Sequence, residues 1–124
     1  MKRLLFICAL AALALPLAAE KKLTPDELSK ALEDKTKVFL LDVREPAELE
    51  QAGIIDGYVN IPLGQLEARL KEVPKNKLII TMCMRGNRAG RAAAILEAAG
   101  YEVYGSCGIV PYQEAGYKTS TLKK

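Results

Sequence analysis

Histidine and tryptophan are both absent from this sequence, and aromatic residues make up only 6% of it. The lack of histidine excludes a nucleophile activated by an imidazole, as in the cysteine proteases. Neither sign of charge dominates, because 18 basic residues stand against 15 acidic ones, for a formal net charge of +3. We therefore expect no nucleic-acid-binding surface. The sequence has three cysteines, a number that does not require a disulfide.

One long apolar run is present, and it lies at the N-terminus. Lys2 and Arg3 precede a stretch from Leu4 to Leu17 built mainly of leucine and alanine, and small residues follow up to Ala19. This order of basic, apolar and small-residue regions predicts a secretory signal peptide over residues 1–19, and hence a periplasmic or secreted protein. The alternative is a retained membrane anchor, although the run is short for a bilayer span.

Removal of the signal would leave residues 20–124, which are 105 of the 124 residues and suit one compact domain. The net charge would fall from +3 to +1, because Lys2 and Arg3 leave with the signal. We expect this single domain to be a monomer that makes no contact with a membrane.

The most informative stretch of that domain runs from Leu78 to Leu96. A short apolar run with β-branched residues ends at Cys83 and predicts a buried parallel strand. A segment of arginine and glycine follows, and then alanines and leucine at helical spacing predict a helix that ends at Gly100. Cys83 therefore belongs at the carboxyl edge of a sheet, where α/β folds bind their ligands.

The residues around Cys83 suit a reactive thiol. Backbone N–H groups at the start of a helix attract anions, and Arg85, Arg88 and Arg91 add positive charge. Gly86 lets the loop backbone approach a bound group closely. Such a field favours the thiolate, which is the nucleophilic form, so Cys83 is the candidate nucleophile. The alternative is a buried structural cysteine, since free cysteine is often buried.

The rest of the domain alternates between strand and helix patterns. This alternation predicts a small parallel sheet with helices on both faces, an α/β fold. Asp42 and Arg44, at the end of one strand, are expected to form a scaffold ion pair. Helices are predicted from residue 25 to about 33, from 44 to 50 and from 65 to 71, and further strands over 38–43, 58–61 and 101–104.

Three segments of the sequence resemble the successive signatures of rhodanese-domain sulfurtransferases, in particular the small exported single-domain forms. They are Leu41-Asp42-Val43-Arg44-Glu45, the stretch from Gly53 to Pro62, and Cys83-Met84-Arg85-Gly86-Asn87-Arg88 with Ala92-Ala93 behind it.

The resemblance implies a function as well as a fold. Cys83 would take a sulfane sulfur from a small donor such as thiosulfate, hold it as a persulfide, and pass it to cyanide or a thiol. No cofactor and no metal ion is implied. The loop implied to bind the substrate and cradle the persulfide consists of Met84, Arg85, Gly86, Asn87 and Arg88.

Two other functions can be compared with this one. A cysteine phosphatase of related fold would need five residues between its cysteine and its arginine, whereas four separate Cys83 from Arg88, so the spacing argues against it. A sulfur-carrier or redox binding module, with weak turnover of small molecules, stays open.

Cys107 is the least expected residue of the domain. It is predicted to lie in the turn formed by Gly105-Ser106-Cys107-Gly108 after the last strand. By the family resemblance this turn borders the same pocket as Cys83. Cys107 is then either a small packing residue or a resolving thiol that attacks the persulfide or an oxidised form of Cys83 and closes a disulfide.

If residues 1–19 are a cleaved signal, protein recovered from outside the cytoplasm should begin within a residue or two of Glu20. N-terminal sequencing or intact mass of the exported protein measures this. Recovery of a membrane-bound product that begins at Met1 would show the anchor instead.

Overall fold

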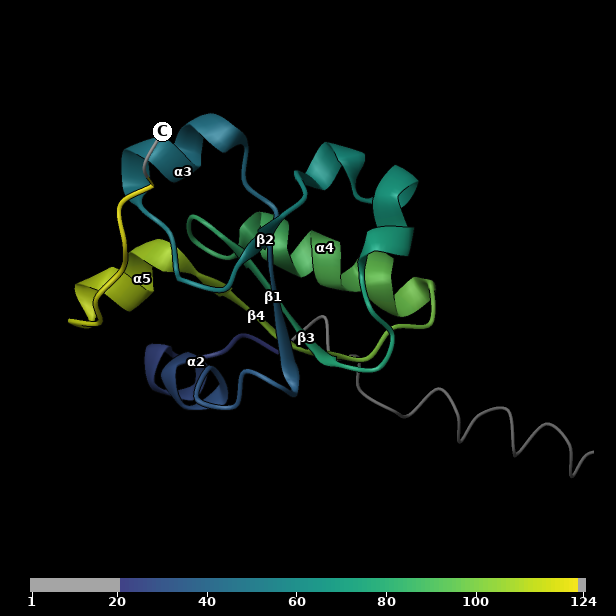
Figure 1. Cartoon of the computed structure of the whole chain (residues 1–124), viewed down its shortest axis with the longest axis horizontal. Coiled ribbons are helices and arrows are strands. Elements are labelled where there is room, and N and C mark those ends of the chain that lie inside the picture. Colours follow the sequence, from purple (N-terminus) through teal and green to yellow (C-terminus); the bar gives the residue numbers. More distant parts are fainter. Residues whose placement is uncertain (1–20, 123–124) are drawn as a thin grey trace, which may run out of the picture.

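The computed structural model describes residues 21–122, so the predicted signal peptide lies outside the described residues. Four parallel strands form one sheet in the order β2-β1-β3-β4 (Figure 1). The prediction of an α/β fold with a small parallel sheet is confirmed. Among the described residues, no helix is both long and apolar enough to cross a membrane. The strands are β1 (Val38–Asp42), β2 (Val59–Asn60), β3 (Leu78–Cys83) and β4 (Val103–Gly108).

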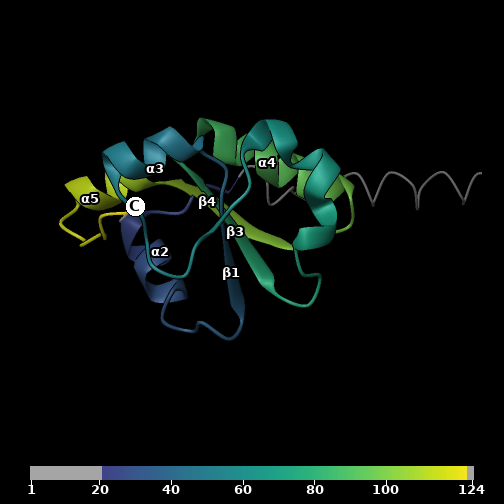
Figure 2. The same cartoon turned by 45° about the horizontal axis from the view of Figure 1, so that its top comes forward.

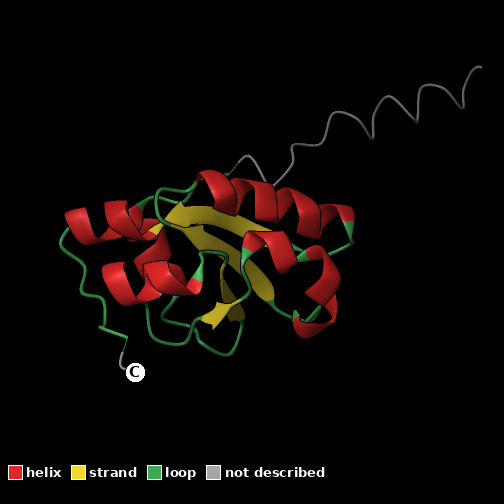
Figure 3. Ribbon diagram, turned by 90° about the horizontal axis from the view of Figure 1, so that it is seen from above, coloured by secondary structure: helices red, strands yellow, loops and turns green. Residues whose placement is uncertain are grey.

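Helices cover both faces of the sheet, as Figures 2 and 3 show. Helix α4 and two short 3₁₀ helices pack on one face, and α2 and α5 pack on the other. The helices are α2 (Pro25–Ala31), α3 (Pro46–Ala52), η2 (Leu63–Gln65), η3 (Glu67–Glu72), α4 (Asn87–Ala98) and α5 (Ile109–Glu114).

Two hydrophobic clusters follow from the alternation of side chains along the strands. Successive residues of a strand point to opposite faces of the sheet. Leu41 and Ile79 accordingly join the cluster under α4, and Leu40 and Ile80 join the cluster under α2 and α5. All four are buried, which explains why the strands have continuous apolar runs.

Helix α2 begins as the sequence predicts. Thr24 accepts a hydrogen bond from the Glu27 N–H (3.1 Å), and the Glu27 carboxylate accepts one from the Thr24 N–H (2.9 Å), which completes a capping box. Pro25 occupies the first helical position, where its missing N–H costs nothing.

The segment predicted as one helix over residues 65–71 is helical, but it forms two short 3₁₀ helices rather than one regular helix. The chain forms η2 and η3 there, and Arg69 interrupts the helical dihedral angles with φ −119° and ψ 22°. Leu63 and Leu66 are three residues apart, a spacing that matches the three residues per turn of a 3₁₀ helix. Leu66 is fully buried in the cluster under α4, so packing decides this segment.

The predicted end of the last strand is also wrong. Strand β4 continues to Gly108, and α5, which the sequence did not predict, begins directly after it. Glycine is a poor strand former, so Gly105 and Gly108 suggested a turn. Both are needed for close packing, because a Cβ at Gly105 would lie 2.7 Å from Leu23 and one at Gly108 would lie 2.7 Å from the Arg85 backbone.

Candidate active site

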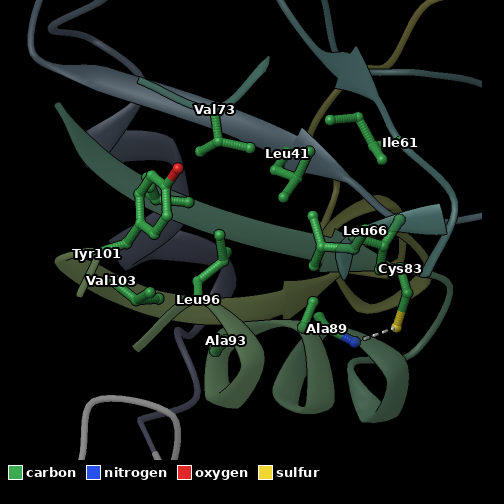
Figure 4. Packing of buried hydrophobic residues seen from close by; sticks show 13 residues of the cluster. Leu41, Ile61, Leu66, Val73, Cys83, Ala89, Ala93, Leu96, Tyr101 and Val103 are labelled. Atoms are coloured by element: carbon green, nitrogen blue, oxygen red, sulfur yellow. Dashed lines mark hydrogen bonds between the residues drawn. The ribbon is translucent and has the colours of Figure 1, made fainter. Parts of the chain in front are cut away.

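Cys83 is the last residue of β3 and its side chain faces α4 (Figure 4). Only 1% of the residue is exposed. The chain leaves the strand through Met84 and Arg85, turns at Gly86 with φ 108°, and enters α4 at Asn87. Glycine is the residue that adopts this left-handed conformation without strain, so Gly86 allows the tight return of the loop above the sulfur.

Two backbone amides donate hydrogen bonds to the Cys83 sulfur. The Gly86 N–H lies 3.0 Å from Sγ and the Ala89 N–H lies 3.3 Å from it. Both donors belong to the first turn of α4 or its cap, where N–H groups have no partner within the helix. Their dipoles and the positive end of the helix stabilise a thiolate or another anion at this place.

The three arginines predicted to surround the thiol have different surroundings. Arg88 forms a two-pronged ion pair with Glu48 of α3, with both N···O distances 2.7 Å. Arg85 and Arg91 are exposed, and within residues 21–122 neither has an ion-pair partner. Arg88 therefore joins α4 to α3, and Arg85 is the loop arginine that makes no ion pair within residues 21–122.

The Arg88–Glu48 pair changes the titration of both groups. Its hydrogen bonds lower the pKa of Glu48 from 4.5 to about 2, and the Glu48 carboxylate raises the pKa of the Arg88 guanidinium. Glu48 also accepts a hydrogen bond from the Glu45 N–H (2.9 Å) at the start of α3. One carboxylate thus caps α3 and holds the start of α4.

Asp42 and Arg44 form the expected scaffold ion pair, and both are fully buried. The Arg44 guanidinium donates to both Asp42 carboxylate oxygens at 2.6 to 3.1 Å, and to the Gly53 carbonyl oxygen at 2.9 Å. It also lies 3.7 Å from the sulfur of Met84 in the loop. The pair supports the loop from below without contacting Cys83.

Cys107 lies within β4 rather than in the predicted turn. It pairs in register with Met82, whereas Cys83 pairs with Gly108, so the two thiols point to opposite faces of the sheet. Neighbouring strands are about 4.8 Å apart, so distance is not the obstacle to a disulfide, but side chains that point apart cannot be bridged. This placement favours the packing role for Cys107.

The surroundings of Cys107 also suit packing. Its thiol donates to the Thr81 carbonyl oxygen (3.5 Å), and burial raises the pKa of this thiol far above its usual range. The side chain borders a cavity of about 190 Å³ to which Lys22 and Arg85 also contribute.

A comparison with known families agrees with this geometry. Residues 24–109 match the model of the rhodanese-like domain. The chain belongs to the rhodanese-like family.

The rhodanese-like domain has relatives in several organisms. It is 36% identical over 76 residues to a sulfurtransferase of Allochromatium vinosum, covering 61% of this chain and 70% of that protein. It is 45% identical over 69 residues to the uncharacterized protein YqhL of Bacillus subtilis, covering 55% of this chain and 54% of that protein. A crystal structure of a rhodanese-related protein from Thermoplasma volcanium superimposes with a TM-score of 0.71 at 29% identity, covering 79% of this chain and 95% of that one.

The sequence of this rhodanese-like domain does not predict the roles of three residues of the site. Glu48 holds Arg88 across 40 positions, and a single sequence gives no signal for such a pair. Thr81 bonds the Ala89 carbonyl oxygen (2.7 Å), and its one visible signal was a hydroxyl within an apolar strand. Gly108 was noted, but as part of a turn. Within residues 21–122, no three metal-ligating side chains lie close enough to hold an ion.

Replacement of Glu48 by glutamine should destabilise the rhodanese-like domain by about 1 to 2 kcal/mol at pH 7, a figure discounted for solvent access to the pair. Because the folded-state pKa is lowered, the contribution of Glu48 is complete above pH 4.5 and is lost as the pH falls toward 2. Urea unfolding of parent and Glu48→Gln proteins across this range should show the difference shrinking. The exposed Glu67→Gln is the control, and a constant difference at all pH values would contradict the assignment.

Mild peroxide should not form a disulfide between Cys83 and Cys107. Intact mass should show added oxygen on the parent domain rather than the loss of two hydrogens, because the thiols face opposite sides of the sheet. The Cys107→Ala variant should oxidise like the parent. A loss of two hydrogens that Cys107→Ala abolishes would establish the resolving role instead.

Proposed function

We propose that this domain is a sulfurtransferase in which Cys83 carries the transferred sulfur as a persulfide. The observation that carries the proposal is the pair of N–H groups, from Gly86 and Ala89, that donate to the Cys83 sulfur. Membership of the rhodanese-like family and the 36% identity to a sulfurtransferase support it.

In the first step the Cys83 thiolate attacks the outer, sulfane sulfur of thiosulfate. A new S–S bond forms to Sγ, the S–S bond within thiosulfate breaks, and sulfite leaves with the bonding electron pair. Negative charge is present on the attacking and leaving groups throughout. Preorganised N–H donors stabilise such charge without reorganising, and removing one donor of this kind commonly costs about 2.7 to 4 kcal/mol in other enzymes.

In the second step a nucleophile such as cyanide attacks the outer sulfur of the persulfide. A bond forms from the acceptor to this sulfur, the S–S bond to Cys83 breaks, and the electron pair returns to Sγ. The product is thiocyanate, and the thiolate is regenerated with no net change of charge. The loop amides that held the thiolate before the first step hold it again after the second.

Arg85 is the side chain that we assign to recognition of an anionic donor. It is exposed, it belongs to the loop, and it is unpaired within residues 21–122. Arg88 acts indirectly, because its ion pair with Glu48 fixes the start of α4, which supplies the Ala89 amide.

The site of action that we propose is the periplasm or the exterior of the cell. Support comes from residues 1–19 alone, whose basic, apolar and small-residue regions follow the order of a secretory signal. We also propose that the exported domain is a monomer.

Incubation of the domain with thiosulfate should add the mass of one sulfur atom to Cys83, and cyanide should remove it. The Cys83→Ser variant should take up no sulfur, and its turnover should fall by roughly three orders of magnitude or more, because a serine hydroxyl is not ionised by the same field. Intact mass and thiocyanate release measure the two quantities.

Cys107→Ala is the matched control, since it removes the other described thiol and should retain both sulfur uptake and turnover. Near-normal turnover in Cys83→Ser would overturn the proposal. Sulfur uptake on Cys83 with negligible release to cyanide would show the sulfur-carrier alternative.

A further inference from the structure

Residue Ala89 of α4 is held at both of its peptide groups by side chains of β3. The Thr81 hydroxyl donates to the Ala89 carbonyl oxygen (2.7 Å), and the Ala89 N–H donates to the Cys83 sulfur (3.3 Å). Thr81 and Cys83 are two residues apart in the strand, so both side chains point toward α4. Figure 4 shows the second of these contacts as a dashed line from the Ala89 nitrogen to the Cys83 sulfur.

The Thr81 hydroxyl is not needed to satisfy the backbone of α4. A carbonyl group in the first turn of a helix already accepts a bond from the N–H four residues later. The cluster of buried residues on this face of the sheet is hydrophobic, and Thr81 is fully buried beside it. A hydroxyl buried in such a place must find a partner, whereas valine has the same shape and needs none. The hydrogen bond from the Thr81 hydroxyl to the Ala89 carbonyl oxygen therefore joins β3 to the first turn of α4.

We propose that Thr81 is a positioning residue, which fixes the first turn of α4 so that the Ala89 N–H reaches the Cys83 sulfur. The inference rests on the proposed function of Cys83 as the nucleophile. The Thr81 hydroxyl bonds the same residue whose N–H donates to the sulfur. A shift of the start of α4 along β3 would therefore change the distance from the Ala89 N–H to the Cys83 sulfur directly. Of the two N–H contacts to Sγ, the one from Ala89 is the longer, so a small further increase in its length weakens it most.

Loss of the Thr81 hydroxyl would weaken the hydrogen bond from the Ala89 N–H to the negatively charged Cys83 sulfur. Without the Thr81 bond, the thiolate of Cys83 loses part of the hydrogen bonding that favours it over the thiol. Sulfur uptake, which needs the thiolate, slows. Thr81 does not touch the sulfur, and it acts through Ala89 alone.

The test compares Thr81→Val, Thr81→Ser and Ser106→Ala in the otherwise unchanged domain. The rate at which iodoacetamide alkylates the peptide containing Cys83 is measured against pH by mass spectrometry, and sulfur uptake from thiosulfate is measured in parallel. Ser106 is the matched control because it is in register with Thr81 on the next strand, is fully buried, and bonds the Lys21 carbonyl oxygen rather than α4.

Thr81→Val should move the midpoint of the alkylation profile upward by about 0.5 to 1 unit, which corresponds to roughly 3- to 10-fold less thiolate below the midpoint. At pH values below the midpoint, sulfur uptake should fall by the same factor. Thr81→Ser, which keeps the hydroxyl, and Ser106→Ala should both follow the parent. Thermal unfolding establishes that each variant is folded.

An unchanged midpoint in folded Thr81→Val would overturn the positioning role, whatever the uptake rate. Should Thr81→Val not fold, Thr81→Ala against Thr81→Ser gives the same comparison, since those two differ only by the hydroxyl. The two proposals fail separately. A shifted midpoint together with no sulfur uptake in the parent would overturn the sulfurtransferase function and leave the positioning role in place.

Discussion

A fully buried ion pair fixes the end of the sheet on which the sulfur site is built. Asp42 ends β1, and the Arg44 guanidinium beside it also contacts the Gly53 carbonyl after α3 and the Met84 side chain of the loop. Asn60 of β2 donates to the carbonyl oxygens of both Asp42 and Arg44. A buried charge that loses its partner costs several kcal/mol, so these segments cannot separate independently. The loop above Cys83 therefore rests on a platform, formed by the Asp42–Arg44 pair and the segments it joins, that has little freedom to move.

On that platform, the sulfur is held by dipoles rather than by side-chain cations. Both hydrogen bonds to Sγ come from backbone N–H groups at the start of α4, while Arg88 is paired with Glu48. Backbone donors are fixed by the helix and need no ordering when an anion arrives. The result is a site that favours negative charge at the Cys83 sulfur, as the proposed passage between thiolate and persulfide requires.

The sequence was informative wherever a local pattern decides the structure. The parallel sheet, the start of a helix at Pro25 and the position of Cys83 at a strand end all follow from spacing and from the chemistry of single residues. It failed where distant packing decides. Gly108 resembles a turn residue until the Arg85 backbone is placed against it, and the sequence carries no signal for the ion pair between Arg88 and Glu48.

The placement of Cys107 has a consequence for damage and repair. No second thiol within residues 21–122 faces the Cys83 sulfur. A sulfenic acid formed on Cys83 therefore has no thiol partner within the described residues, and its reduction by a thiol depends on one from elsewhere before further oxidation makes the loss permanent. How long one molecule stays active is then set by the reducing agents around it rather than by its own fold.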